Sequence, residues 1–153
     1  MLTDLVVRNL GTLVHADLAF GPGLTVVTGE SGAGKSMLLR ALALVAGAKG
    51  DVGWVAREAD HIRVEAEFDL TTEIQRAIEV ACPDVWEGET PARLIISRTV
   101  GGRSRSVVDG RMVPLNQQGA VASLLMVMHG QHDQRQLTRP SVQRELLDRF
   151  CGA

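Results

Sequence analysis

A glycine-rich stretch at residues 29–36 constrains this chain more than any other feature. It matches the whole pattern G-x-x-x-x-G-K-[ST], in which glycines let backbone N–H groups turn inward around phosphate oxygens. Residues 24–28, just before it, are apolar and rich in β-branched side chains, which predicts a strand buried on both faces. Residues 37–46, just after it, are apolar almost all round and stop at Gly47, as a buried helix does. Strand, loop and helix together predict a site for a nucleotide's phosphates.

Two side chains of this stretch carry the expected chemistry. Lys35 would reach the β- and γ-phosphates, and the Ser36 hydroxyl would ligate Mg²⁺. The helix that opens there adds its free N–H groups and its dipole. The plain alternative is a glycine turn without a ligand, but the flanking runs favour binding. The residues predicted to hold the nucleotide are Gly29, Glu30, Ser31, Gly32, Ala33, Gly34, Lys35 and Ser36.

Composition narrows the possible classes. A length of 153 residues suits one domain, and 45% apolar with 22% charged residues describes an ordinary globular protein. The net charge of −2 gives no overall attraction to nucleic acid, so any such contact needs a local patch. Aromatic residues at 3% argue against a base-stacking platform for single strands. No apolar run has membrane-spanning length, and Cys82 and Cys151 are expected to be reduced thiols.

The chain around the loop reads as antiparallel strands with short helices. Residues 2–10 and 13–20 predict a hairpin, and residues 61–69 alternate as a half-exposed strand. Thr72 matches a capping box, so a helix should run from there to Cys82 and Pro83. A meander is predicted where two-residue turns at Gly101-Gly102 and Asp109-Gly110 separate short strands. These strands are residues 94–100, 103–108 and 111–113.

The C-terminal third predicts three further elements. Residues 114–123 can form a helix, and the apolar run 124–128 predicts a second buried strand. A final helix should begin near residues 138–141 with Pro140 in its first turn. The fold class is therefore mixed α/β, a P-loop NTPase with an N-terminal antiparallel β-hairpin and a β-meander.

An expected motif is missing. A P-loop ATPase needs a second, acidic motif after an apolar strand, which holds Mg²⁺ and polarises water. The apolar runs here end in Ser97-Arg98, in Asp109-Gly110 or in His129-Gly130, and none delivers an acidic pair. A guanine-recognition motif is also absent. A complete nucleotide kinase or GTPase therefore fits poorly, and part of an active site fits well.

The hairpin, the segment 20–29 and the phosphate loop resemble the start of the structural-maintenance-of-chromosomes (SMC) ATPases, which are ABC-type. The loop is most similar to the RecN family of bacterial DNA repair proteins, as are residues 102–110, 113–115 and 129–133. With residues 146–148, this resemblance covers nearly the whole chain. In such proteins the ATPase head is split, and a long antiparallel coiled coil separates its two halves. The acidic and signature motifs belong to the second half.

The resemblance implies a domain organisation and partners. Residues 1–153 would form the N-terminal part of a single head, and residues 140–153 would start a helix leading towards a coiled coil. The partners would be the C-terminal half of the same head, a second head in an ATP-bound homodimer, and DNA. The setting would be the bacterial cytoplasm or nucleoid, without a membrane.

The resemblance also assigns residues. Gln131 would be the glutamine-loop residue that contacts Mg²⁺ and senses the γ-phosphate, so Lys35 and Gln131 are the expected catalytic residues. Ser36 and Gln131 are the expected metal ligands, and Arg57 would lie near the nucleotide and the partner head. The cofactors would be ATP and Mg²⁺.

Two local patterns keep alternative interpretations. His129, His132 and Asp133 could bind a metal, but their spacing is weak evidence without a second cluster. The four arginines of the meander could contact a DNA backbone or another subunit, or they could face solvent. Alternation would put two of them, Arg103 and Arg105, on one face. The other two are Arg98 and Arg111.

Two functions of different classes remain. In the first, the chain belongs to an ATP-hydrolysing head in DNA double-strand-break repair and recombination, in which ATP drives head engagement. The full-length protein would then be the ATPase, and this chain alone would be nearly inactive. In the second, the chain is a P-loop binding module that uses ATP as a switch or structural ligand without turnover.

Overall fold

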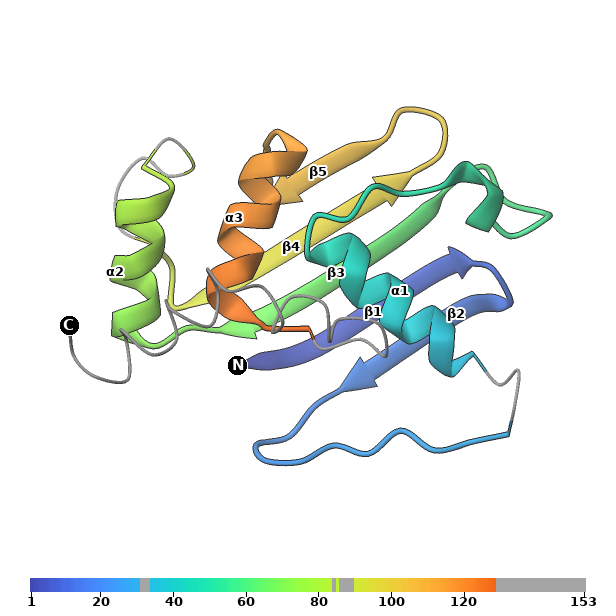
Figure 1. Ribbon diagram of the computed structural model, residues 1–153, viewed down its shortest axis with the longest axis horizontal. Coiled ribbons are helices and arrows are strands. Elements are labelled where there is room, and N and C mark those ends of the chain that lie inside the picture. Colours follow the sequence, from blue (N-terminus) through green and yellow to red (C-terminus); the bar gives the residue numbers. More distant parts are fainter. Residues whose placement is uncertain (31–33, 84, 86–89, 129–153) are drawn as a thin grey trace, which may run out of the picture.

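The computed structural model describes residues 1–30, 34–83, 85 and 90–128. Their strands form one six-stranded antiparallel sheet in the order β2-β1-β3-β4-β5-β6. Figure 1 shows α1 and α3 lying across the same face of this sheet. The strands are β1 (Leu2–Leu10), β2 (Leu13–Ala19), β3 (Ile62–Asp69), β4 (Arg93–Val100), β5 (Arg105–Val108) and β6 (Arg111–Met112). The helices are α1 (Lys35–Val45), α2 (Thr72–Ala81), α3 (Leu115–Leu125) and the 3₁₀ turn η1 (Val52–Trp54).

The predicted hairpin and the half-exposed strand are confirmed. β1 and β2 pair directly, and both Asn9 and Gly11 adopt a φ of 60° at their turn. β3 lies beside β1 near the middle of the sheet, and its alternate residues point into the core. This alternation gives the sheet one apolar face under the helices and one polar outer face. The fully buried side chains of β3 are Ile62, Val64, Ala66 and Phe68.

The meander is also confirmed, with one difference. Asp109 and Gly110 form the predicted two-residue turn, and both have positive φ, as a type I′ hairpin requires. Gly101 and Gly102 also have positive φ, but β5 starts only at Arg105. The connection therefore spans residues 101–104, and Arg103 lies in a loop.

Helix α3 holds the C-terminal end of α1 through a buried amide. Gln118 is completely buried, and its Nε2 donates to the carbonyl oxygens of Leu44 and Val45 at 2.8 Å each. Beside it the two backbones touch, because a Cβ on Gly47 would lie 2.7 Å from the Cα of Gly119. Gly47 also has a φ of +89°, which closes the helix in the usual left-handed way.

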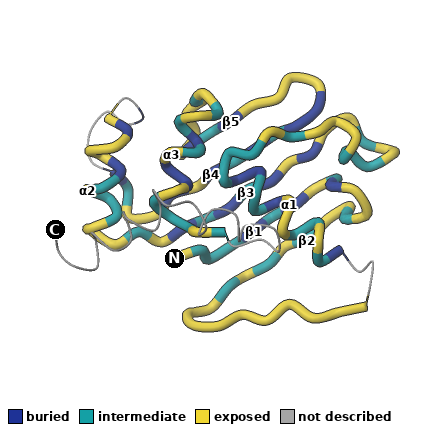
Figure 2. Tube along the Cα trace, viewed as in Figure 1, coloured by how far each residue is buried: buried dark blue, intermediate teal, exposed yellow. Residues whose placement is uncertain are grey.

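The prediction of a buried strand at residues 24–28 is wrong. The described residues from 21 to 30 form no strand, and Figure 2 shows this segment exposed along its length. Leu24 is 90% exposed, Val26 69% and Val27 51%. A strand needs a neighbour for its backbone groups, and no strand in the described part of the chain pairs with this segment.

Two other local predictions are corrected. Residues 124–128 form no strand, because α3 continues to Leu125 and Met126 is its C-cap in an extended conformation. The helix α2 begins as predicted, but its N-cap is Thr71, whose Oγ1 accepts from the Ile74 N–H. Ile74 therefore occupies the third helical position, so there is no reciprocal capping box. The predicted final helix and Cys151 lie outside the described residues.

The sheet also divides the meander's arginines. Arg98 pairs with Val64 and Ser106, so it points to the apolar face, where it is only 7% exposed. Its Nη1 donates to the Arg105 carbonyl oxygen at 2.9 Å, and burial lowers the pKa of its guanidinium. Arg111 pairs with buried Val108 and shares that side. Only Arg105, with Arg103 in the loop before it, is left for the outer face.

Within the described ranges, no helix is both long enough and apolar enough to cross a membrane.

Replacing Gln118 with Leu should destabilise the fold, because the buried carbonyl of Val45 would lose its donor. We expect the free energy of unfolding to fall by about 1–3 kcal/mol, the usual cost of a buried polar group left unpaired. Urea unfolding measures this, with Gln117→Leu on the same helix as the control. Equal stability of the two variants would contradict a stabilising role for the Gln118 hydrogen bonds to α1.

Candidate functional site

The phosphate-loop lysine stands at the first position of α1 and turns back towards the loop. Its Nζ donates to the carbonyl oxygen of Glu30 at 2.6 Å and also to that of Gly29. Gly34, just before it, has a left-handed φ of 90° and caps the helix. The Gly34 carbonyl accepts from the N–H groups of Met37 and Leu38. The ammonium group is thus held against the segment that enters the loop.

This arrangement suits an anionic ligand. The first turn of α1 contains no acidic residue, so the helix dipole and the Lys35 ammonium act together on negative charge. A bound phosphate would offer Lys35 charged oxygens in place of the two carbonyls. Ser36 follows in the first helical turn and is exposed, so its hydroxyl is accessible to a metal bound beside the phosphates.

The turn of the β1–β2 hairpin packs against the start of α1. A Cβ on Gly11 would lie 2.7 Å from the Met37 sulfur, and a Cβ on Gly34 would lie 3.0 Å from the Leu13 Cδ1. Both glycines also have positive φ. This close approach fixes the end of the phosphate loop against the hairpin.

The segment 54–59, which we call the strap, is hydrogen-bonded to the same turn. The Gly11 N–H donates to the Trp54 carbonyl at 2.6 Å, and the Ala56 N–H donates to the Asn9 carbonyl at 3.0 Å. From α1, the Arg40 guanidinium carbon lies 5.0 Å from the centre of the Trp54 ring, a cation–π contact. Hairpin turn, strap and α1 are therefore joined in one unit.

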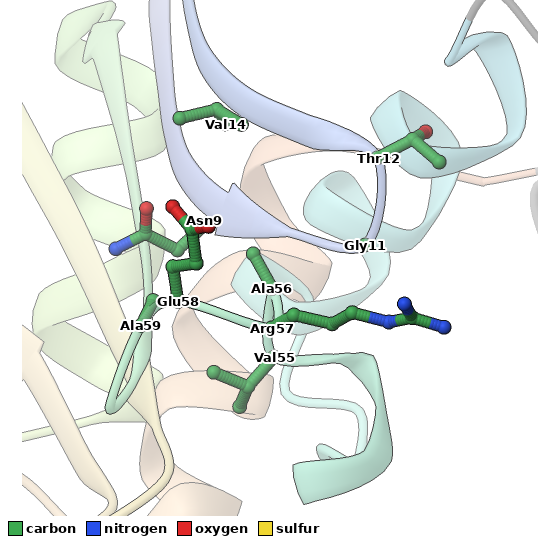
Figure 3. Close-up of a pocket in the computed structure, with 9 residues that line it drawn as sticks. All are labelled: Asn9, Gly11, Thr12, Val14, Val55, Ala56, Arg57, Glu58 and Ala59. Carbon is green, nitrogen blue, oxygen red and sulfur yellow. The ribbon is translucent and has the colours of Figure 1, made fainter.

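Arg57 lies on the strap and lines a pocket of about 640 Å³ between the strap and the hairpin turn. Figure 3 shows its side chain extending away from Asn9 and Glu58. Arg57 is exposed, so its guanidinium is free to meet a ligand or another surface. Asn9 and Glu58 also line the pocket, together with Gly11, Thr12, Val14, Val55, Ala56 and Ala59.

A second, apolar pocket lies beside the phosphate-loop lysine. It measures about 240 Å³ and is lined by side chains of β1, β2 and α1 together with Phe20 and Val27. Leu39 on the same helix is 59% exposed. Together with the exposed residues 24–27, this makes one side of α1 an uncovered apolar surface.

The structure brings together some of the predicted site residues. Gly29, Glu30 and Lys35 are in contact, with Gly34 and Ser36 adjacent, and Arg57 is joined to this unit through the strap. Ser31, Gly32, Ala33 and Gln131 lie outside the described residues. Sequence reasoning missed the positions of Asn9, Arg40 and Trp54, although Trp54 in a polar loop was a signal of a specific contact.

No metal cluster is present in the described ranges, since they contain no group of three or more His, Cys, Asp or Glu side chains placed to hold an ion. The candidate ligands His129, His132 and Asp133 lie outside these ranges.

Comparison with known families decides the classification. Residues 4–99 match the family described as AAA domain, which is more than half of the chain. The chain belongs to this family. The matched region contains the phosphate loop, the hairpin, the strap and most of the sheet described above.

The resemblance to RecN is confirmed along the whole chain. The chain is 36% identical over 160 residues to the DNA repair protein RecN of Mycobacterium leprae, and the match covers 100% of this chain. RecN of Vibrio cholerae is 34% identical over 153 residues. The chain spans 27% of the length of each of these relatives, and it corresponds to their N-terminal part.

Solved structures confirm the fold class as a P-loop head of the SMC type. The Smc head domain with coiled coil and joint from Pyrococcus yayanosii superposes with a TM-score of 0.73 at 19% identity, over 99% of this chain and 32% of that one. A structure from work on ATP-driven dimerization and DNA-stimulated activation of SMC ATPases has a TM-score of 0.67 at 18% identity. The superposition covers 96% of this chain and 97% of the chain in that structure.

Proposed function

We propose that this chain is the ATP-binding part of an SMC-like ATPase head that acts in DNA double-strand-break repair and recombination. The observation that carries this proposal is the Lys35 ammonium, held against the phosphate loop at the N-terminus of α1. Membership of the AAA domain family and the similarity to RecN support it.

Within this proposal, each loop residue has a defined role. Lys35 would neutralise charge on the β- and γ-phosphates, and backbone N–H groups of the phosphate loop would donate to the phosphate oxygens. Ser36 provides one oxygen ligand for Mg²⁺, which would polarise the phosphoryl group when bound. Arg57 meets the nucleotide or the opposing head from the strap.

Hydrolysis requires groups beyond these. Mg²⁺ prefers octahedral coordination by oxygen ligands, and Ser36 supplies only one of them. We assign a second ligand to Gln131 by its resemblance to the glutamine loop, and the acidic group to the C-terminal half of the same head. The uncovered apolar surface of α1 and residues 24–27 supports this partner, because contiguous exposed apolar area is typical of an interface.

A binding module without turnover is the second candidate function. The apolar runs of this sequence end in Ser97-Arg98, Asp109-Gly110 or His129-Gly130, without an acidic pair, which favours it for this chain taken alone. ATP would then act as a switch or a structural ligand. In the first candidate function, two heads engage around ATP and both contribute to the reaction.

Lys35→Ala should weaken binding of MgATP to the chain roughly tenfold to a hundredfold, because a charged hydrogen-bond donor to phosphate is lost. The thermal stabilisation given by MgATP should shrink accordingly. Lys49→Ala is the matched control, since Lys49 is the only other lysine and is exposed. Undiminished MgATP binding by a folded Lys35→Ala variant would refute the site.

Gln131→Ala in the full-length protein should slow hydrolysis at saturating ATP and weaken ATP-dependent head association. Its affinity for ATP should change less, because the phosphate loop is intact. Phosphate release and sedimentation measure the two effects, with Gln117→Ala as the control. Wild-type turnover by Gln131→Ala would remove this residue from the site.

The isolated 153-residue chain should bind ATP without hydrolysing it. Adding the C-terminal half, by coexpression or through a short linker, should restore phosphate release. The rate should rise more than linearly with protein concentration, because two heads must meet around the nucleotide. Lys35-dependent turnover by the chain alone would instead mean that its own residues complete the site.

A further inference from the structure

Strand register places basic side chains in a row across the outer face of the sheet. Arg8 on β1 is opposite His15 on β2 and opposite Arg63 on β3. Arg63 is opposite Thr99 on β4, which in turn is opposite Arg105 on β5. The row therefore crosses five neighbouring strands. It is far from obvious in the sequence, because its members are separated by up to 97 residues.

The row lies on the side away from the core. Its neighbours along β1 and β3, Val7, Ile62 and Val64, are fully buried under the helices, so the row residues point the other way. The three arginines and His15 are all exposed. Figure 1 shows α1 and α3 on the opposite face, so neither of these helices covers the row.

Arg103 extends the row at the β4–β5 turn. It lines a shallow pocket of about 440 Å³ together with Arg63 and Arg105. Asp60 and His61 line the same pocket. We call the four arginines Arg8, Arg63, Arg103 and Arg105 the basic end of the outer face.

The same face is acidic at its other end. Asp4 is opposite Glu67, and Val6 is opposite Asp17 and Glu65, so the next two rows carry carboxylates. Arg93 at that end is paired with Glu67 at 3.1 Å and with Asp69 at 3.2 Å. Positive charge is thus concentrated at one end of the outer face and negative charge at the other. The net charge of −2 for the whole chain does not reveal this separation.

One arginine of the basic end is restrained by a neighbour. The Arg63 guanidinium is 2.8 Å from the Glu65 carboxylate, and this contact raises the pKa of Arg63. The pair is partly exposed, so it is weak and can exchange for a stronger anionic partner. Glu65 therefore limits the positive charge available at the basic end.

The dimensions and chemistry fit the backbone of a nucleic-acid duplex. From Arg8 on β1 to Arg105 on β5 the basic end spans four neighbouring strands, or roughly 14 Å at about 4.8 Å spacing, a little less than half of the duplex's helical turn of about 34 Å. Guanidinium groups match phosphate oxygens bidentately. Asn9 lines a pocket with Arg8 and Arg63, but its Nδ2 donates to the His61 carbonyl oxygen at 3.2 Å, so the basic end offers little to read bases with.

We propose that the basic end of the outer face binds the phosphate backbone of double-stranded DNA, without sequence preference. This inference rests on the proposed function, in which DNA is a partner of the full-length protein. It assigns the contact to Arg8, Arg63, Arg103 and Arg105. Two arginines that sequence alone grouped with Arg103 and Arg105, Arg98 and Arg111, are excluded because they lie on the apolar side.

A charge-matched pair of variants of the full-length protein tests the proposal. Arg8→Ala with Arg105→Ala should weaken binding to a random-sequence duplex roughly tenfold to a hundredfold at about 0.1 M salt. The slope of log affinity against log salt should fall by about 1.8, which corresponds to two lost phosphate contacts. Arg76, exposed on α2, and Arg111, on the apolar side of β6, lie away from the basic end. Arg76→Ala with Arg111→Ala therefore removes the same charge elsewhere and should leave this slope unchanged. Equal slopes for both pairs would overturn the assignment.

A second variant gives an effect that unfolding cannot mimic. Glu65→Gln removes a carboxylate from the row beside the basic end and releases Arg63, so duplex affinity should rise about two- to fivefold. Glu67→Gln, at the acidic end, is the control and should change affinity less. Unchanged or weaker binding by Glu65→Gln would overturn the proposal.

The proposed function and the proposed DNA surface can be wrong independently of each other. MgATP binding and phosphate release should be retained in every variant in the absence of DNA, because none of the substituted residues lies in the phosphate loop. If Lys35-dependent ATP binding is present while the duplex slopes do not differ, only the DNA surface is wrong. If wild-type protein binds no ATP, the proposed function itself is wrong.

Discussion

The contact between the hairpin turn and the first turn of α1 is the constraint on which the site depends. A Cβ on Gly11 would lie 2.7 Å from the Met37 sulfur and a Cβ on Gly34 3.0 Å from the Leu13 Cδ1, and both glycines adopt positive φ. The end of the loop at Gly34 is therefore packed closely against the hairpin turn. The strap is hydrogen-bonded to the same turn. The hairpin turn therefore positions both Arg57 and Lys35, although 22 residues separate them in the sequence.

The sheet has separate roles for its two faces. The apolar face carries α1 and with it the phosphate loop, whereas the outer face is polar and charged. Because alternation decides the face of every strand residue, neighbouring arginines in one meander have opposite roles. Arg98 donates to the Arg105 carbonyl from the apolar side and stabilises the β4–β5 hairpin, while the Arg105 side chain points outward.

The sequence predicted features that depend on local patterns and missed those that depend on partners. The alternation of residues 61–69 and the Asp109-Gly110 turn were sufficient, because both are local. Residues 24–28 have a strand composition, but a strand exists only when neighbours accept its backbone groups. Alternation along residues 94–100, read in the same way, would have placed the Arg98 side chain on the buried face with Leu94 and Ile96. The basic row could not be predicted from the sequence, because it depends on the register between β1 and β3, and neither segment alone determines that register.

The contact of Gly47 with Gly119 has a mechanical consequence. At this point the backbone just after α1 touches the backbone of α3 without intervening side chains, and Gln118 binds the last carbonyls of α1. The joint is at the C-terminal end of an 11-residue helix, about 16 Å from the end that carries Lys35. Helix α1 is thus held at both ends, by this joint and by the hairpin turn. A tilt of about ten degrees about the joint would move the lysine by roughly 3 Å, about the length of one hydrogen bond, so the position of Lys35 depends on both contacts.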